Sequence, residues 1–157
     1  MKSMVTPHMS KAIPTTLSLL LLTGMIVSLT SMTSVPDSIV GKWESADKEY
    51  TWEFFKGGES YFAKLITSND ALEPDGKTFK KDVKNSDQKL KNRSLQGIIF
   101  VFSLKYNDGA YTDGKIYAFS DGNLYDCKAT VEGNKLYFRA YKGVSILGKT
   151  IEFNHVK

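Results

Sequence analysis

After residue 95 the chain alternates apolar and polar residues along short segments that closely spaced turn signals separate. Alternation with a period of two places every second side chain on one face, which is typical of a half-buried β-strand. The turns are rich in Gly, Asn and Asp and fall at 107–109, 120–123 and 132–135. Short connections make each strand the neighbour of the next, so this part of the sequence predicts an antiparallel meander.

The remaining strands lie before residue 67 and at the C-terminus. Residues 50–58 ("YTWEFFKGG") alternate aromatic and polar side chains and end in a glycine turn, and 60–66 ("SYFAKLI") return as the second half of a hairpin. A short strand at 39–45 and a last one at 149–156 bring the number to eight. Eight meandering strands close most simply into a barrel, which is either filled or holds one small ligand. We therefore predict an all-β fold, an eight-stranded antiparallel up-and-down β-barrel with one long loop.

That loop is the polar segment 67–93, which is too long for a simple turn. It is either a lid-like loop or contains a short helix at 86–92, with Ser86 as its N-cap. Its polar cluster has two interpretations. The side chains form a polar rim or lid at the barrel mouth, or Arg93 pairs with an aspartate and pins the loop, which we favour. The cluster consists of Asp82, Asn85, Asp87 and Arg93.

The first 34 residues differ from the rest and have the three parts of a secretory signal peptide. Lys2 and Lys11 are their only charges, an apolar run of 13 residues follows at 17–29, and small residues come next. As a helix this run would span about 20 Å, short of the roughly 30 Å of bilayer hydrocarbon. We expect a signal peptide at 1–34, cleaved within 30–36, and a barrel domain at 35–157. The alternative is an uncleaved signal that anchors the protein to the membrane.

The first predicted strand contains Gly41-Lys42-Trp43. A Trp buries about 150–250 Å², and a Gly lets the chain enter the strand without a Cβ in the way. This spacing resembles the Gly-x-Trp signature of lipocalins. The resemblance implies that Trp43 lies across the closed end of the barrel and that an Arg from a late strand packs on its ring. Arg139 is the candidate, although in a regular strand its side chain would face outward.

A closer resemblance covers almost all of 35–157. It rests on "IVGKWES" at 39–45, on "GKIY" at 114–117, and on the spacing of Asp82, Asn85, Asp87, Leu90, Arg93, Leu95 and Gly97 and of Arg139, Tyr141, Gly143, Leu147, Gly148 and Thr150. Together these residues resemble the exported bacterial family catalogued as domain of unknown function 2147. The chain departs from that family at Ser86 and Ser94, where the family has Pro, and at 111–114 and 118–119. The resemblance implies a lipocalin-like barrel in a Gram-negative periplasm and no established activity.

The sequence lacks the residues that several kinds of catalytic and metal-binding site require. Residues 35–157 contain one His and one Cys, His155 and Cys127, so a Ser–His–acid triad or a zinc site has too few partners. Without residues 1–34 the formal net charge falls from +4 to +2, and no basic stripe suggests nucleic acid. We expect no catalytic residues, no metal, no cofactor, no nucleic-acid partner and, after signal removal, no membrane span.

The aromatic faces of the predicted strands carry the functional hypotheses. They line a ligand site for a small apolar molecule such as a lipid, or they fill the barrel as a core. The first hypothesis is a non-catalytic periplasmic protein that binds a small apolar or amphipathic molecule. The second is an envelope interaction module that has a filled barrel and acts through its surface or its long loop. An enzyme with paired carboxylates ranks last. The candidate ligand-binding residues are Trp52, Phe54, Tyr61, Phe100 and Phe102.

Overall fold

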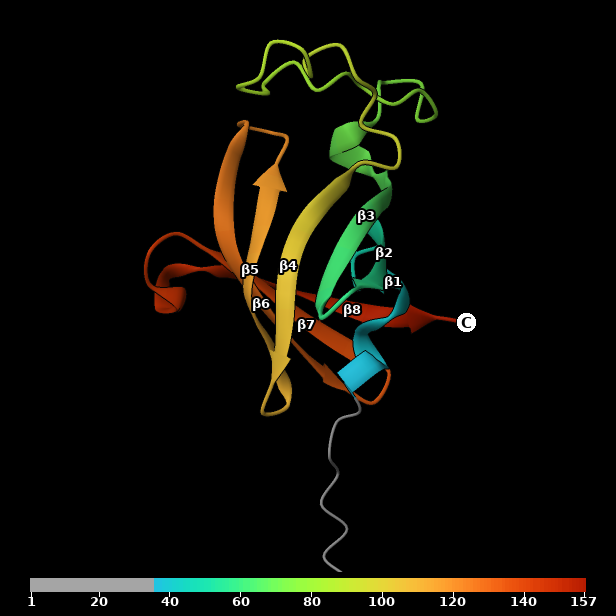
Figure 1. Ribbon diagram of the computed structural model, residues 1–157. Helices are drawn as coiled ribbons and strands as arrows, with labels where there is room; N and C mark the ends of the chain where they lie inside the picture. The colour runs from blue at the N-terminus through green and yellow to red at the C-terminus, as the bar shows by residue number, and fades with distance from the viewer. Residues whose placement is uncertain (1–35) are drawn as a thin grey trace, which may run out of the picture. The chain divides into compact units, whose positions relative to one another are not determined.

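The computed structural model describes residues 36–157 and shows a closed barrel of eight antiparallel strands, each paired with the next in chain order (Figure 1). The last strand also pairs with the first, which closes the barrel and confirms the predicted up-and-down topology. The expected signal peptide lies outside the described residues. The strands are β1 (Gly41–Ser45), β2 (Tyr50–Gly57), β3 (Ser60–Ser68), β4 (Ile99–Asn107), β5 (Ala110–Ala118), β6 (Asn123–Glu132), β7 (Lys135–Tyr141) and β8 (Lys149–Val156).

Three short 3-10 helices interrupt the connections: η1 (Pro36–Ile39), η2 (Asn69–Ala71) and η3 (Ser145–Leu147). The long loop runs over 69–98 rather than 67–93, and its residues 86–92 form turns instead of the helix that was one expectation. The strand expected from residue 95 begins at Ile99. Leu95 is buried, but its backbone N–H bonds the carbonyl of Lys80 within the loop, so burial there does not extend the strand.

Bulges in β4 and β5 interrupt the regular alternation. The pairing register between β3 and β4 shifts at two places, and Ser103 in β4 has a φ of +58°. A bulge inserts an extra residue and changes which face the following side chains occupy. Phe100 and Val101 are consequently both buried, whereas Phe102 is half-buried and lies opposite the exposed Lys115. The expectation that Phe102 shares the interior face with Phe100 is therefore wrong.

Trp43 fills one end of the barrel, which we call the closed end. Its ring is 1% exposed, its Nε1 donates to the carbonyl of Ile39 at 2.7 Å, and His155 meets it edge-on with ring centroids 4.8 Å apart. Gly41 has a φ of +131°, and a Cβ there would lie 2.7 Å from His155 Nε2. Both the backbone angle and the space require glycine at this position.

The helix η1 covers the closed end and is held by tyrosines from the barrel. The Tyr111 hydroxyl donates to the carbonyl of Pro36 at 2.6 Å and accepts from the N–H of Ile39 at 3.0 Å. The Tyr61 hydroxyl donates to the carboxylate of Asp37 at 2.6 Å. The closed end is thus sealed by ring packing and by hydrogen bonds to the backbone of η1.

Replacement of Trp43 by Ala should lower the free energy of unfolding by about 3–5 kcal/mol, because it leaves a cavity and removes the hydrogen bond to Ile39. Val40→Ala, at an exposed position beside it, is the control and should have little effect. Urea unfolding of both variants measures the difference. A loss below about 1 kcal/mol for Trp43→Ala would show that the ring does not plug the barrel.

Candidate functional site

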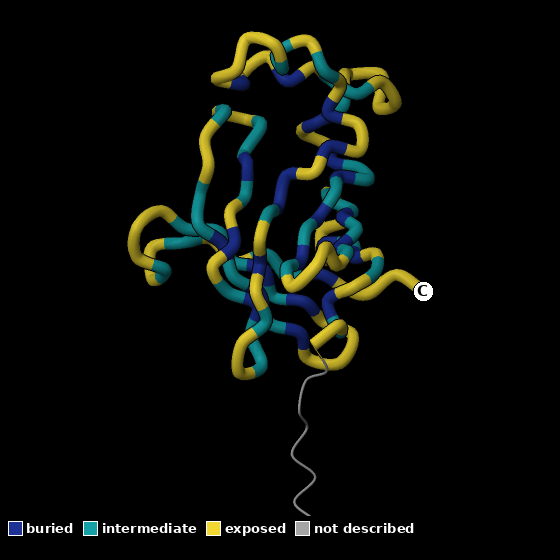
Figure 2. Tube along the Cα trace, in the orientation of Figure 1, coloured by how far each residue is buried: buried dark blue, intermediate teal, exposed yellow. Residues whose placement is uncertain are grey.

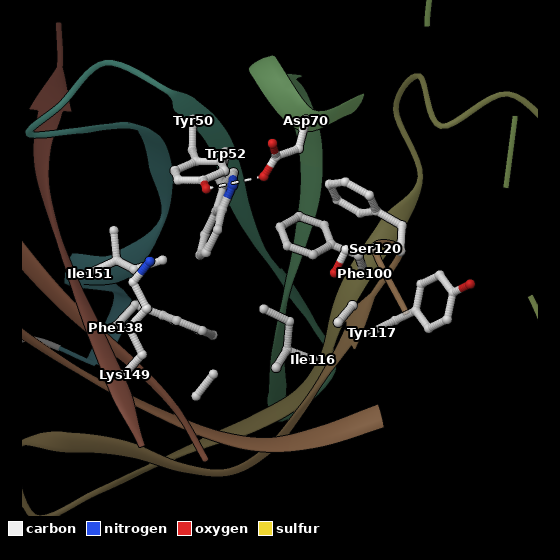
Figure 3. Close-up of a pocket in the computed structure, with 13 residues that line it drawn as sticks. Tyr50, Trp52, Asp70, Phe100, Ile116, Tyr117, Ser120, Phe138, Lys149 and Ile151 are labelled. Atoms are coloured by element: carbon white, nitrogen blue, oxygen red, sulfur yellow. Dashed lines mark hydrogen bonds between the residues drawn. The ribbon is translucent and has the colours of Figure 1, made fainter. Parts of the chain in front are cut away.

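A pocket of about 270 Å³ lies at the end of the barrel opposite η1. Figure 3 shows the residues that line it. Its lining residues sit where β2, β4 and β8 begin and where β5 and β7 end, with Asp70 added from η2. The meander brings these strand ends to one end of the barrel. The walls are mainly apolar and come from five strands, whereas the rim is polar. The walls include Trp52, Phe100, Ile116, Phe138 and Ile151, and the rim includes Tyr50, Asp70, Ser120 and Lys149.

The expected ligand-binding residues divide between this pocket and the core beneath it. Trp52 and Phe100 line the pocket. Phe54 and Tyr61 are buried and are not among the lining residues, so they belong to the packed core. Phe102 is half-buried on the opposite face of β4. The barrel therefore has one continuous core, and the pocket opens above it at one end, with Trp52 and Phe100 belonging to both.

Trp52 forms the part of the pocket wall that meets the core. Its ring packs edge-on against Phe100 and Phe138, with centroids 5.0 Å away in each case. Its Nε1 is buried and has no hydrogen-bond partner among the described residues. Leaving such a donor unpaired costs about 1–3 kcal/mol. The Tyr50 hydroxyl donates a long 3.4 Å hydrogen bond to Asp70 on the same side of the pocket (Figure 3).

The polar cluster of the long loop is organised around the buried carboxylate of Asp82. Arg93 binds it through Nε and Nη2 at 2.9 and 2.8 Å, and the Asn85 amide donates to it at 2.8 Å. The Tyr117 hydroxyl of β5 donates to its other oxygen at 2.6 Å. The Asp87 carboxylate instead accepts from a backbone N–H two residues on. Of the two arrangements that the sequence left open, the structure has the one in which Arg93 pins the loop.

Two contacts fix the loop to the end of β5 and to the turn that follows it. Figures 1 and 2 show the loop next to this turn. One is the Tyr117–Asp82 hydrogen bond. The other is at Gly122, where a Cβ would lie 2.0 Å from the carbonyl oxygen of Lys84. Asp70 is the one lining residue that comes from 69–98. The loop therefore stands beside the pocket and supplies little of its wall.

Arg139 has a different place from the one that the lipocalin resemblance implied. Its guanidinium donates to the carbonyls of Ser145 and Ile146, at 2.6 and 2.9 Å, and to the Thr150 hydroxyl at 2.7 Å. Arg139 pairs with Thr150 on β8, whereas Trp43 pairs with His155, five residues further along. Because β7 is regular there, the side chain faces outward, and the expected stacking on Trp43 is corrected to a contact with η3.

The chemistry that this pocket offers is apolar contact with a few hydrogen bonds. Asp70 is the one carboxylate among its lining residues, and the described His155 packs at the closed end instead. Burial raises the pKa of the Cys127 thiol to about 12, which keeps it protonated. Within residues 36–157 no group of three or more His, Cys, Asp or Glu side chains could hold a metal ion. The geometry suits the binding of a small molecule.

A closed eight-stranded meander with a Gly-x-Trp at its sealed end and a pocket at the other defines a lipocalin-like protein. The chain belongs to the bacterial family described as "Uncharacterized protein conserved in bacteria (DUF2147)", which matches residues 41–155. It is also similar to a solved structure described as protein HP1028 from the human pathogen Helicobacter pylori, which belongs to the lipocalin family. The two are 27% identical, with a TM-score of 0.65 over 76% of this chain and 83% of the other.

Comparison with curated proteins gives no match. Within the described residues, no helix has the length and apolar character needed to cross a membrane.

Several pocket residues were not singled out from the sequence. Phe138 and Ala140 could have been found, because the alternation in 135–141 places them on one face. Lys149 is the first residue of β8 and Asp70 lies in η2, and neither carries such a signal. The Tyr117–Asp82 contact joins residues 35 positions apart, which no local pattern reveals.

Asp82→Ala should release the loop without unfolding the barrel, because it removes the acceptor shared by three side chains. Hydrogen exchange should become faster in 80–97 and stay slow in the strands. Asp75→Ala is the matched control, since the Asp75 carboxylate bonds only to nearby Lys77 and Thr78. Unchanged protection of 80–97 in Asp82→Ala would contradict the role of this carboxylate as the anchor.

Tyr117 predicts a loss of stability at high pH. Burial and the hydrogen bond to Asp82 raise its pKa from 10.0 to about 12. As the pH rises from 10 to 12, the unfolded chain loses this proton first, so the free energy of unfolding falls. In Tyr117→Phe this fall should be smaller, as measured by urea unfolding across the range. The same slope in both proteins would mean that Tyr117 titrates normally.

Proposed function

We propose that this protein is an exported, non-catalytic carrier that binds one small amphipathic molecule in the pocket at the open end of its barrel. The observation that carries the proposal is the pocket of about 270 Å³, with mainly apolar walls, that opens above the buried core. A barrel that needed only a core would gain stability by filling this space as well. The pocket is therefore better explained as a binding site.

The cavity limits the size and chemistry of the ligand. Its volume is at the lower end of the roughly 300–1,000 Å³ of small-molecule sites, so it takes a small compound or the end of a longer one. The apolar walls favour a hydrocarbon or aromatic body. The exposed Lys149 at the rim favours a hydrogen-bond acceptor at the polar end.

The N-terminal pattern supports a periplasmic location. A basic start, a short apolar run at 17–29 and a small-residue tail favour export, and the cleaved signal fits this pattern better than an anchor. Retention of the signal as an anchor is the alternative, and N-terminal sequencing of the protein from the cell envelope distinguishes the two.

A second candidate is an interaction module that uses the long loop. The observation in its favour is the anchoring of the loop by Asp82, which holds a largely exposed polar segment in one conformation (Figure 2). Such a module would need no ligand in the barrel. Paired-carboxylate catalysis is not proposed, because Asp70 stands alone among the pocket residues as an acid.

The chain contains two Trp residues, which pair with each other across β1 and β2 but have different surroundings. Trp52 lines the pocket, whereas the ring of Trp43 packs against Ile39 and His155, so the two provide a matched test. Trp43→Phe leaves Trp52 as the reporter in the pocket, and Trp52→Phe leaves Trp43 as the reporter at the closed end. Both variants are titrated with octanol, octanoate and 1-aminoanthracene. We expect at least one probe to change the fluorescence of Trp52 with a saturating dependence, while that of Trp43 stays constant.

The indole N–H signals in a nitrogen–proton NMR spectrum give the same comparison in the unaltered protein. The Trp52 signal should move on binding, because Trp52 lines the pocket, and the Trp43 signal should not, because Trp43 does not line it and its N–H bonds Ile39. Equal movement of both signals, or no response of Trp52 to any probe, would contradict binding in this pocket.

A further inference from the structure

The connection between β7 and β8 exposes three large apolar side chains in four residues. Val144, Ile146 and Leu147 are 59%, 83% and 80% exposed, and we call them the apolar tip. Figure 1 shows this connection projecting from the barrel wall. Single exposed apolar residues are common on protein surfaces, but a run of three on a projecting turn marks an interaction site.

The backbone beneath the apolar tip is held in place. Arg139 binds the carbonyls of Ser145 and Ile146, and the N–H of Gly148 bonds Ser145 at 3.2 Å. Gly148 also lies against β7, since a Cβ there would be 2.3 Å from the carbonyl of Ala140. The side chains of the tip are thus presented to solvent by a fixed turn, and their exposure is built into the strand connection.

Two lysines flank the apolar tip, and from Lys135 to Ile151 the sequence has no acidic residue. The acids that approach these lysines come from other elements, Asp121 near Lys142 and Asp47 near Lys149. Lys142 and Lys149 flank the tip directly and are both exposed. Lysines beside an apolar segment suit the interface of an anionic bilayer, where the apolar side chains enter the headgroup boundary and the ammonium groups stay near the phosphates.

We propose that the apolar tip docks this protein reversibly onto an anionic membrane surface. A stable protein partner would need about 800 Å² on each side, which is more than three side chains provide, whereas weak membrane association needs only a small apolar anchor with nearby cations. Ala140 and Lys149 line the pocket and adjoin this connection, so docking would bring the pocket close to the lipid. This inference does not depend on a ligand in the barrel.

Co-flotation with vesicles tests the proposal on the protein as the cell processes it. Vesicles of phosphatidylcholine with phosphatidylglycerol are compared with vesicles of phosphatidylcholine alone. We expect binding to the anionic vesicles only, weaker at high salt, and reduced about tenfold or more in the double variant Ile146→Ser, Leu147→Ser. All variants share the same N-terminal segment, so any contribution from it is common to them.

Val83→Ser is the matched control, because Val83 is 60% exposed but lies in the long loop, and it should bind like the parent. Arg139→Lys keeps the charge but cannot hold both carbonyls in the same way, so its binding should be weaker. Equal binding by the parent and the double variant, or no binding by the parent, would overturn the proposal. Self-association that sedimentation detects in the parent but not in the double variant, without vesicle binding, would assign the tip to a second copy instead.

Discussion

The hydrogen bonds that join the Tyr111 hydroxyl to η1 seal the end of the barrel on which the rest of the structure depends. They hold the first described residues against the sheet, at 2.6 Å from Pro36 and 3.0 Å from Ile39. Ile39 in turn accepts the hydrogen bond of Trp43, whose ring fills the closed end. With one Cys in residues 35–157, no internal disulfide can add stability there, so packing and these bonds must provide it. Because the closed end is sealed in this way, the pocket can open at the other end of the barrel.

Hydrogen bonds to the barrel also determine the position of the long loop. The Asp82 carboxylate binds Arg93 within the loop and Tyr117 on β5, and the Lys84 carbonyl lies against Gly122. These contacts hold the loop at one side of the rim. The pocket therefore stays bordered mainly by strand ends. The apolar tip, held by Arg139, occupies the connection between β7 and β8 at the same end of the barrel.

The sequence predicted the barrel because its strands alternate regularly and its turns carry Gly, Asn and Asp. The sequence-based prediction was wrong where the strands depart from regular alternation. The register of β3 and β4 shifts between Ile99 and Val101, so Phe100 and Val101 are both buried and Phe102 falls on the other face. Ser103 and Asp113 adopt positive φ inside strands, which no residue preference announces. The role of Arg139 was also misassigned, because the resemblance outweighed the outward direction that its own strand implied. From the sequence, the barrel interior could be predicted only as one of two alternatives, a filled core or a ligand site. Which one forms depends on how side chains from different strands pack against each other inside the barrel, and local patterns do not reveal this.

The central claim is that the pocket at the open end of the barrel is a binding site, and native mass spectrometry of the protein taken from its own bacterium tests it most directly. We expect a population that carries one additional small molecule, and its loss in Ala140→Phe, whose ring would occupy the pocket. A bare protein mass in the parent, with the fold intact and the same spectrum for Ala140→Phe, would contradict the claim.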